Sequence, residues 1–341
     1  MMATLRAWPF WACAAGLALL PLISGPFYTY LWVTCLIFGI LAMGLDILMG
    51  YTGQVSFGHA AFFGLGAYST AVMIQFYKIQ SLWVSLLVMA VVVGAYALIV
   101  SYFATTRRGI YFALLTLIFA EVVHRIFFYT YAFGASDGIQ GLDPVTILPG
   151  VPVDTPTKIY YVVLAALLVC YLAASVLVRS HFGRVLAAIR ENEDRARFLG
   201  YNVRRYKMVA CVVSALIAGV AGALYPARAG FATPDLLMWT LSGEAIVMVM
   251  LGGAGTLVGP ILGGAFFTIL VEKVSSVWDY YFIAVGLVLA AVVLFMPKGL
   301  FGLVARWTRR REAPGAAGIR VPAGAAAEVR RDPAARAGRR T

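Results

Sequence analysis

The chain has 341 residues, of which 62% are apolar and only 12% are charged. This composition excludes an ordinary soluble domain and indicates a polytopic membrane protein. The net charge is +12, but the bases gather in residues 179–207 and after Pro297, and the stretch from Lys298 onward holds eleven bases against three acids. Charged flanks of a membrane domain explain this pattern better than a nucleic-acid-binding face does.

Long apolar runs predict the membrane segments. At ~1.5 Å per residue, ~20 residues cross a ~30 Å hydrocarbon core, so most runs predict one helix each. The first run partly resembles a secretory signal peptide, but its bulky aromatics and Pro26 favour a retained first helix. We expect an all-α fold of about 8 full transmembrane helices plus one broken half-helix pair, about 9–10 membrane segments. The runs are 8–24, 27–49, 51–77, 82–105, 109–131, 158–178, 207–227, 241–271 and 277–297.

The charged segment 179–207 sets the orientation, because it is too polar to enter a bilayer and short loops rich in bases stay on the cytoplasmic side. Its acids are Glu191, Glu193 and Asp194, and its bases are Arg179, Arg184, Arg190, Arg195, Arg197, Arg204, Arg205 and Lys207. Counting spans from it places the loop 132–157 outside, Arg107 and Arg108 inside and Lys78 outside. Both termini are then cytoplasmic, and only the loop with Lys78 departs from the charge rule.

Within this segment the apolar residues fall at roughly helical spacing with charges between them. They are Val185, Leu186, Ile189, Ala196 and Leu199. The pattern predicts a short amphipathic helix that Gly200 ends. Such a helix needs a surface to lie on. The alternative is a solvated basic loop that only satisfies the charge rule.

Two glycine clusters interrupt apolar runs, at 50–66 and at 252–260. The second predicts two half-helices that enter the membrane and return, which also brings the tail back to the cytoplasm. Three glycines of each cluster align with a one-residue gap, which suggests two related halves. Clusters at corresponding places point to a translocation path, while close helix packing is the alternative. The candidate path glycines are Gly50, Gly53, Gly58, Gly252, Gly253, Gly255 and Gly259.

Ionisable side chains inside spans are costly and usually have partners in the bundle interior. Glu121 and Arg125 are four residues apart in the favourable order and predict a neutralising pair. Glu244 opens the half-helix that leads into the second cluster and is a candidate path residue. A lone histidine such as His59 is more often a hydrogen-bonded packing residue. The full set is Asp46, His59, Glu121, His124, Arg125, Glu244, Glu272 and Lys273.

Signs of catalysis are absent from the sequence. It has no phosphate-binding G-x-x-x-x-G-K-[ST], no H-E-x-x-H and no C-x-x-C, so we expect no catalytic residue, no cofactor and no ATP hydrolysis by this chain alone. Cys13, Cys35, Cys170 and Cys211 lie in apolar runs without paired spacing, which predicts neither a disulfide nor a metal site. We assign 1–305 to a transmembrane domain and 306–341 to a basic, disordered cytoplasmic tail.

The sequence motif FGRVLAAIRENEDRARFLGYNVRRYK resembles the coupling loop of M-type permeases in branched-chain amino acid ABC importers, the LivM family. GYTGQVSFGHAAFFGLGAY, RRGIYFALLTLIFAE, SGEAIVMVMLGGAGTLVGPILG and MPKGLFG extend the resemblance over about residues 30–305. The chain departs from the pattern at Asp194 and Arg195, where relatives more often carry small or apolar residues. The matching loop residues are Gly183, Arg184, Arg190, Glu191, Asn192 and Gly200.

This resemblance implies a permease subunit of the bacterial inner membrane whose loop docks on an ATPase. It also implies a second permease of the LivH type, two cytoplasmic ATPases of the LivG and LivF types, and an extracytoplasmic solute-binding protein. The solute would be a branched-chain amino acid or a related small polar compound. The rivals are an ion-coupled secondary transporter that uses Asp46, Glu121 or Glu244 as carriers, and a membrane scaffold that transports nothing.

Overall fold

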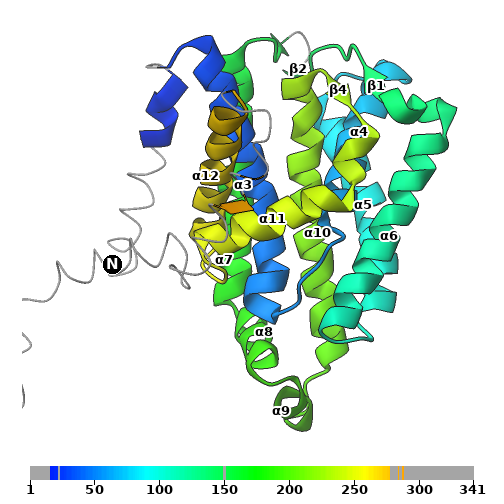
Figure 1. The fold of residues 1–341 in the computed structure, drawn as a ribbon, viewed down its shortest axis with the longest axis vertical. Helices are drawn as coiled ribbons and strands as arrows, with labels where there is room; N and C mark the ends of the chain where they lie inside the picture. Colours follow the sequence, from blue (N-terminus) through cyan, green and yellow to red (C-terminus); the bar gives the residue numbers. More distant parts are fainter. Residues whose placement is uncertain (1–15, 22–23, 149–150, 277–282, 284–285, 288–341) are drawn as a thin grey trace, which may run out of the picture. The chain divides into compact units, whose positions relative to one another are not determined.

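The computed structural model describes residues 16–21, 24–148, 151–276, 283 and 286–287 (Figure 1). The expected helical membrane fold is confirmed there, since six helices of the described part are long and apolar enough to cross a bilayer. Residues 16–21 are helical within the predicted first run. The predictions for the run 277–297, the domain boundary at 305 and the basic tail lie outside the described residues.

Helices make up most of the described chain. The six candidate spans are α3 (Pro26–Thr52), α5 (Leu82–Ala104), α6 (Ile110–Tyr129), α7 (Pro156–Arg179), α10 (Val203–Ala229) and α12 (Val258–Ser275). The shorter α-helices are α4 (His59–Gln75), α8 (His181–Glu191), α9 (Glu193–Phe198) and α11 (Trp239–Gly252). The short 3-10 helices are η1 (Tyr131–Phe133), η2 (Ala135–Asp137) and η3 (Pro234–Leu237).

Helix α3 forms the centre of the bundle and packs against α7, α10 and α12. Its most apolar stretch is 89% buried, against 33% for that of α6. Small residues allow this close approach, because a Cβ on Gly44 would lie only 3.1 Å from the Ser214 carbonyl oxygen of α10. Likewise, a Cβ on Gly66 of α4 would collide with the Gly219 carbonyl of α10.

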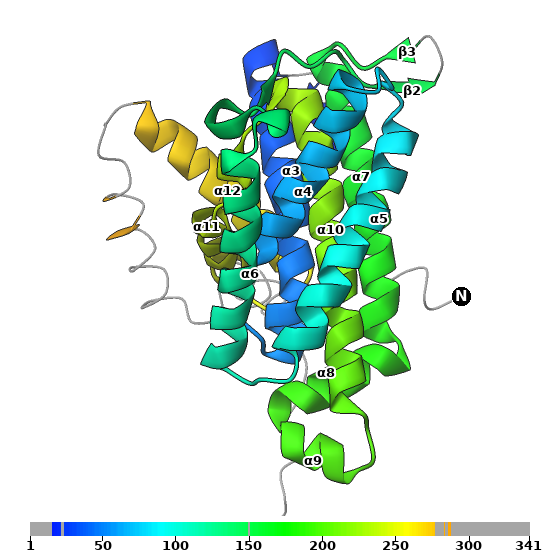
Figure 2. The same cartoon turned by 90° about the vertical axis from the view of Figure 1, so that its right-hand side faces the viewer.

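The two ends of the bundle differ (Figure 2). One end carries two small antiparallel sheets, in which β1 (Ile139–Gln140) pairs with β4 (Phe231–Ala232) and β2 (Thr146–Leu148) pairs with β3 (Val151–Pro152). These strands correct the expectation of a purely helical fold. Strands of two or three residues leave no local alternation, and β1 and β4 are far apart in the chain. The other end carries α8, α9 and the connection between α5 and α6 (Figure 2).

Both glycine clusters break the helices, although not always where expected. The predicted run 51–77 is not one helix, because Gly53, with φ of 73°, ends α3 and α4 begins only at His59. In Figure 1 the connection turns back along the bundle before α4 starts. The run 241–271 divides into α11 and α12 inside the predicted break, and α11 lies across the other helices (Figure 1). Helix α12 returns antiparallel to α3, with the Lys273 ammonium 5.7 Å from the Tyr28 ring centroid.

Candidate functional site

A buried carboxylate on α3 holds the break between α11 and α12. Asp46 is fully buried, its Oδ1 accepts a hydrogen bond from the Gly255 amide at 2.7 Å, and its Oδ2 accepts one from the Leu257 amide at 3.1 Å. Buried carboxylates need such donors, and these two fix the chain where both residues have positive φ, 83° at Gly255 and 56° at Leu257. A positive φ is costly for leucine, so the carboxylate stabilises a strained backbone.

The two glycine clusters meet beside this carboxylate. Gly50 lies one turn after Asp46, and a Cβ there would collide with both the Asp46 carboxylate and the Gly255 amide nitrogen. A Cβ on Gly255 would lie 3.2 Å from the Gly50 carbonyl oxygen. The two clusters are thus in direct contact at these two residues, although the alignment pairs Gly50 with Gly252 and Gly53 with Gly255. Whether a solute passes there stays a prediction.

Three of the other candidate glycines pack helices together. A Cβ on Gly252 would collide with the Gly259 carbonyl, so these two close α11 onto α12. A Cβ on Gly58 would lie 3.0 Å from the Thr116 carbonyl oxygen of α6. Gly253 has φ of 106° and turns the chain after α11. Close packing accounts for Gly58, Gly252 and Gly259, which was the alternative for both clusters.

Arg190 of α8 joins the charged segment to the glycine contact. Its Nη1 donates to the Gly50 carbonyl oxygen, and a Cβ on Gly53 would lie 3.2 Å from its Cγ. A Cβ on Gly255 would lie 3.1 Å from the same Nη1. We call Asp46, Gly50, Arg190, Gly255 and Leu257 the Asp46 junction. One side chain of the charged segment therefore contacts both broken regions.

The charged segment folds as two short helices rather than one, and we call α8 and α9 together the island. Asn192 separates them, and its Oδ1 caps α9 by accepting from the Arg195 amide at 2.9 Å. A Cβ on Gly183 would collide with the Val178 carbonyl, so Gly183 permits the tight turn from α7 into α8. Gly200 follows α9 with φ of 88°, which confirms it as the terminator.

The apolar face of the island agrees with the prediction except at its tip. Val185, Leu186, Ile189 and Ala196 are buried. Leu199 was expected on this face but is 71% exposed, and neighbouring Phe198 is 91% exposed. Both residues fall at the end of α9, beyond the surface against which the island packs. Arg184 and Glu191 are exposed, and their side chains have no partner among the described residues.

Arg108, which the sequence reasoning used only as a topology marker, pairs with the island. Its Nη2 and Nη1 donate to the two oxygens of Asp194 at 2.8 and 3.1 Å, and its Nε lies 2.9 Å from Glu193 Oε1. Lys207 binds Glu193 Oε2 at 2.6 Å. The Arg108 guanidinium holds the pKa of Asp194 below its usual value. The sequence indicated this contact only through Asp194, where the chain departs from the family pattern. Arg195, the other departure, is exposed, and its side chain is unpaired among the described residues.

His59 is fully buried and hydrogen-bonded, and its role as a packing residue stays a prediction. Its Nε2 lies 2.7 Å from Ser214 Oγ, which itself donates to the Gly44 carbonyl oxygen at 2.5 Å. Because the serine proton is used on Gly44, the imidazole carries its hydrogen on Nε2. Within the described ranges, Cys35, Cys170 and Cys211 are free and buried, and no three His, Cys, Asp or Glu side chains converge as metal ligands.

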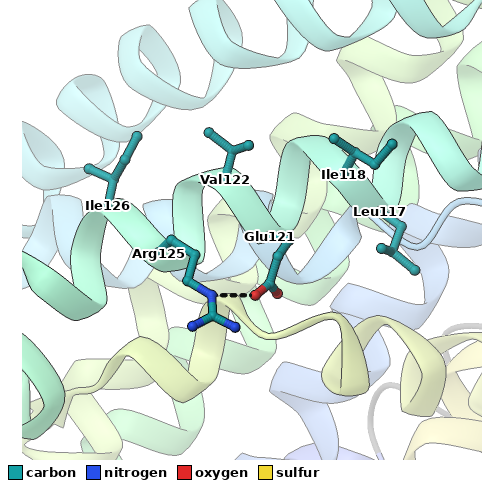
Figure 3. Close-up of a pocket in the computed structure, with 6 residues that line it drawn as sticks. All are labelled: Leu117, Ile118, Glu121, Val122, Arg125 and Ile126. Atoms are coloured by element: carbon teal, nitrogen blue, oxygen red, sulfur yellow. Dashed lines mark hydrogen bonds and ion pairs between the residues drawn. The ribbon is translucent and has the colours of Figure 1, made fainter.

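The predicted pair of Glu121 and Arg125 is confirmed, with 2.6 Å between Oε1 and Nε, but it faces outward from α6. The side chains are 32% and 58% exposed and line a shallow pocket with apolar neighbours (Figure 3). His124 is buried, with Nδ1 3.7 Å from Glu121 Oε2. Glu244 on α11 is half-buried and has no hydrogen-bond partner in the described part of the chain, while Glu272 is exposed. The neighbours in the pocket are Leu117, Ile118, Val122 and Ile126.

Comparison with known proteins finds a matching family model and several similar permease proteins. A family model described as the permease component of branched-chain amino acid transport systems matches residues 27–297. The chain is 28% identical over 288 residues to the high-affinity branched-chain amino acid transport system permease protein LivM of Escherichia coli K12, covering 78% of this chain and 68% of LivM. It is 25% identical over 285 residues to LivH of the same strain, covering 78% and 91%.

A shorter similarity is to the autoinducer 2 import system permease protein LsrC of Klebsiella pneumoniae, 37% identical over 128 residues, which is 35% of this chain and 37% of LsrC. No solved structure matches the chain. The family model nevertheless spans almost all of the described helices and both breaks. The chain therefore belongs to the family of branched-chain amino acid transport system permease components.

Proposed function

We propose that this chain is a permease subunit of an ABC importer that forms half of the path for branched-chain amino acids or a related small solute. The observation that carries the proposal is the two-sided island. Arg190 on one side contacts Gly50 at the Asp46 junction, and Phe198 and Leu199 at the tip are 91% and 71% exposed. Exposed apolar residues on a charged, rigid element suit docking of a soluble partner.

The docked partner is a pair of cytoplasmic ATPases, since the chain has no nucleotide-binding motif of its own. Their closure would push the island as a rigid body. Because Arg190 is bonded to the last turn of α3, the push reaches Gly50 and Gly255 directly. We assign the ATPase contacts to exposed Arg184 and Glu191, with Gly183, Asn192 and Gly200 shaping the island. The path residues are then Gly50, Gly255 and Glu244.

The second permease belongs on the outer face of α6. The pair of Glu121 and Arg125 is 32% and 58% exposed in this chain, and an ion pair facing lipid tails inside a membrane is unfavourable. A second permease with a water-filled path between the subunits would cover it. The named relatives support this arrangement, because LivM and LivH are permease proteins of one kind of transport system and both resemble this chain. A solute-binding protein would deliver the substrate at the opposite end from the island.

We propose that the island end of the bundle is cytoplasmic in the bacterial inner membrane and that both termini lie on the same side. Residues 1–305 form about 8 spans and the broken half-helix pair, and residues 306–341 form a cytoplasmic tail. In a cysteine-free background, Asp154→Cys and Asp235→Cys then react with an impermeant thiol reagent added to intact cells, whereas Asp194→Cys does not. Reaction at Asp194→Cys would reverse the orientation.

Transport by the assembled complex tests the function. The chain is reconstituted in vesicles with the second permease, the ATPases and the binding protein, and uptake of labelled leucine is measured with and without ATP. Uptake that needs ATP and all partners supports the proposal. Uptake driven by a proton or sodium gradient without ATPases would favour the secondary transporter, and no uptake of any tested amino acid, amide or urea would favour the scaffold.

A further inference from the structure

The connection between α5 and α6, residues 105–109, is held against the island by one arginine. Arg108 donates from Nη1 and Nη2 to both oxygens of Asp194 at 3.1 and 2.8 Å, while its Nε contacts Glu193 at 2.9 Å. A planar guanidinium with two carboxylates fixes direction as well as distance, which a lysine ammonium cannot do. The contact joins segments that are 86 residues apart in the sequence.

A second set of contacts stabilises the same region, where the end of α5, the start of α10 and α9 meet. Arg204 at the start of α10 donates to the Tyr102 carbonyl oxygen at 2.9 Å, and its guanidinium carbon lies 4.6 Å from the centre of that ring. Lys207, with only 3% of its side chain exposed, takes the second oxygen of Glu193 at 2.6 Å. The end of α5, the start of α10 and α9 are therefore tied together around Arg108.

Arg108 stands directly before α6. Gly109, with φ of 57° and ψ of −130°, separates it from Ile110, the first residue of that helix. Helix α6 is also lightly packed, since 33% of its most apolar stretch is buried against 89% for α3. Because Arg108 lies two residues before Ile110, a displacement of the island would be passed to α6 and to the exposed pair of Glu121 and Arg125.

We infer that Arg108 is a positioning residue through which movement of the island reaches α6, on a route separate from that of Arg190 to the Asp46 junction. The inference rests on the proposed docking of ATPases on the island. It also gives Asp194, at which the chain departs from the family pattern, a specific role as the acceptor of the Arg108 hydrogen bonds. Movement of α6 would change the face on which we place the second permease.

The test follows α6 itself. In the reconstituted complex, with the four cysteines replaced, Ile118→Cys on α6 reports thiol reactivity before and after the ATPases are trapped with vanadate. Val169→Cys on α7 is the control position, because it is 66% exposed and α7 joins the island directly at Ser180 rather than through Arg108. We expect trapping to change reactivity at Ile118→Cys, Arg108→Glu to abolish that change and lower leucine uptake per ATP several-fold, and Arg107→Glu to do neither.

Charge exchange separates transmission from folding. Arg108→Glu combined with Asp194→Arg re-forms a pair of opposite charges, and we expect it to restore both the reactivity change and the uptake per ATP. Normal coupling in Arg108→Glu would overturn the inference, as would loss of ATPase binding in that variant, because Arg108 would then be a docking contact. An exchange variant that folds but stays uncoupled would also overturn it. If the unaltered complex does not transport with ATP, the proposed function itself fails.

Discussion

The Asp46 junction and the Arg108 contact both attach the island to the membrane helices, but they are built differently. At the junction a fully buried carboxylate and an arginine bind backbone groups, namely the Gly255 and Leu257 amides and the Gly50 carbonyl. At Arg108 the partners are the side chains of Glu193 and Asp194, and Asp194 is 61% exposed. The hydrogen bonds from backbone amides to the buried Asp46 carboxylate tolerate almost no change in shape, whereas an exposed charge pair such as Arg108 and Asp194 is screened and replaceable.

The largest effect is expected from filling the junction. Gly255→Leu puts a side chain where φ is 83°, and its Cβ alone would lie 3.1 Å from Arg190 Nη1 and 3.2 Å from the Gly50 carbonyl oxygen. The left-handed conformation alone costs about 1–2 kcal/mol for a residue other than glycine. We expect uptake to be lost while the complex still assembles and hydrolyses ATP.

The matched control is Gly243→Leu on α11, because nothing lies within 4 Å of a Cβ there. Leucine uptake and complex yield are measured for both variants. If Gly255→Leu lowers only the amount of folded protein, with normal uptake per complex, then the glycine contact serves packing and not the path.

Asp46→Asn is expected to have the next largest effect. An amide offers one oxygen and one NH2 group, so either the Gly255 or the Leu257 amide loses its acceptor. An unsatisfied buried donor costs about 1–3 kcal/mol. We expect a lower midpoint of thermal unfolding and weaker uptake, with Asp154→Asn, an exposed acid, as the control. Normal stability together with loss of ion-driven uptake would instead identify Asp46 as an ion carrier.

The sequence predicted the helical charged segment, the break at 252–260, the pair of Glu121 and Arg125 and the terminator Gly200, because each leaves a local signal of charge, glycine content or helical spacing. It did not predict that α4 starts only at His59, because an apolar run does not record where its helix begins. The partners of Asp46 and Arg108 lie 209 and 86 residues away. Such pairings depend on how helices pack, so no periodicity within one segment indicates them.

A smaller effect is expected at the end of α9. Gly200 has φ of 88° but open space around it, so Gly200→Val costs about 1 kcal/mol or somewhat more through backbone conformation alone. We expect normal membrane insertion and reduced uptake per ATP, because the island tip is misoriented. Gly200→Asn is the control, since asparagine tolerates this conformation. Equal defects in the two variants would show that the change acts through something other than the backbone angle.

The central claim is that the island passes ATPase closure to the Asp46 junction through Arg190, and the ratio of solute taken up to ATP hydrolysed tests it most directly. Arg190→Met keeps the length of the side chain but removes the donor to the Gly50 carbonyl oxygen. Arg195→Met on α9 is the control, because Arg195 is exposed and its side chain has no partner in the described part of the chain. Coupling through Arg190 predicts that Arg190→Met hydrolyses ATP in a fully assembled complex with uptake reduced to a small fraction, while Arg195→Met keeps the normal ratio. A normal ratio in Arg190→Met would contradict the claim.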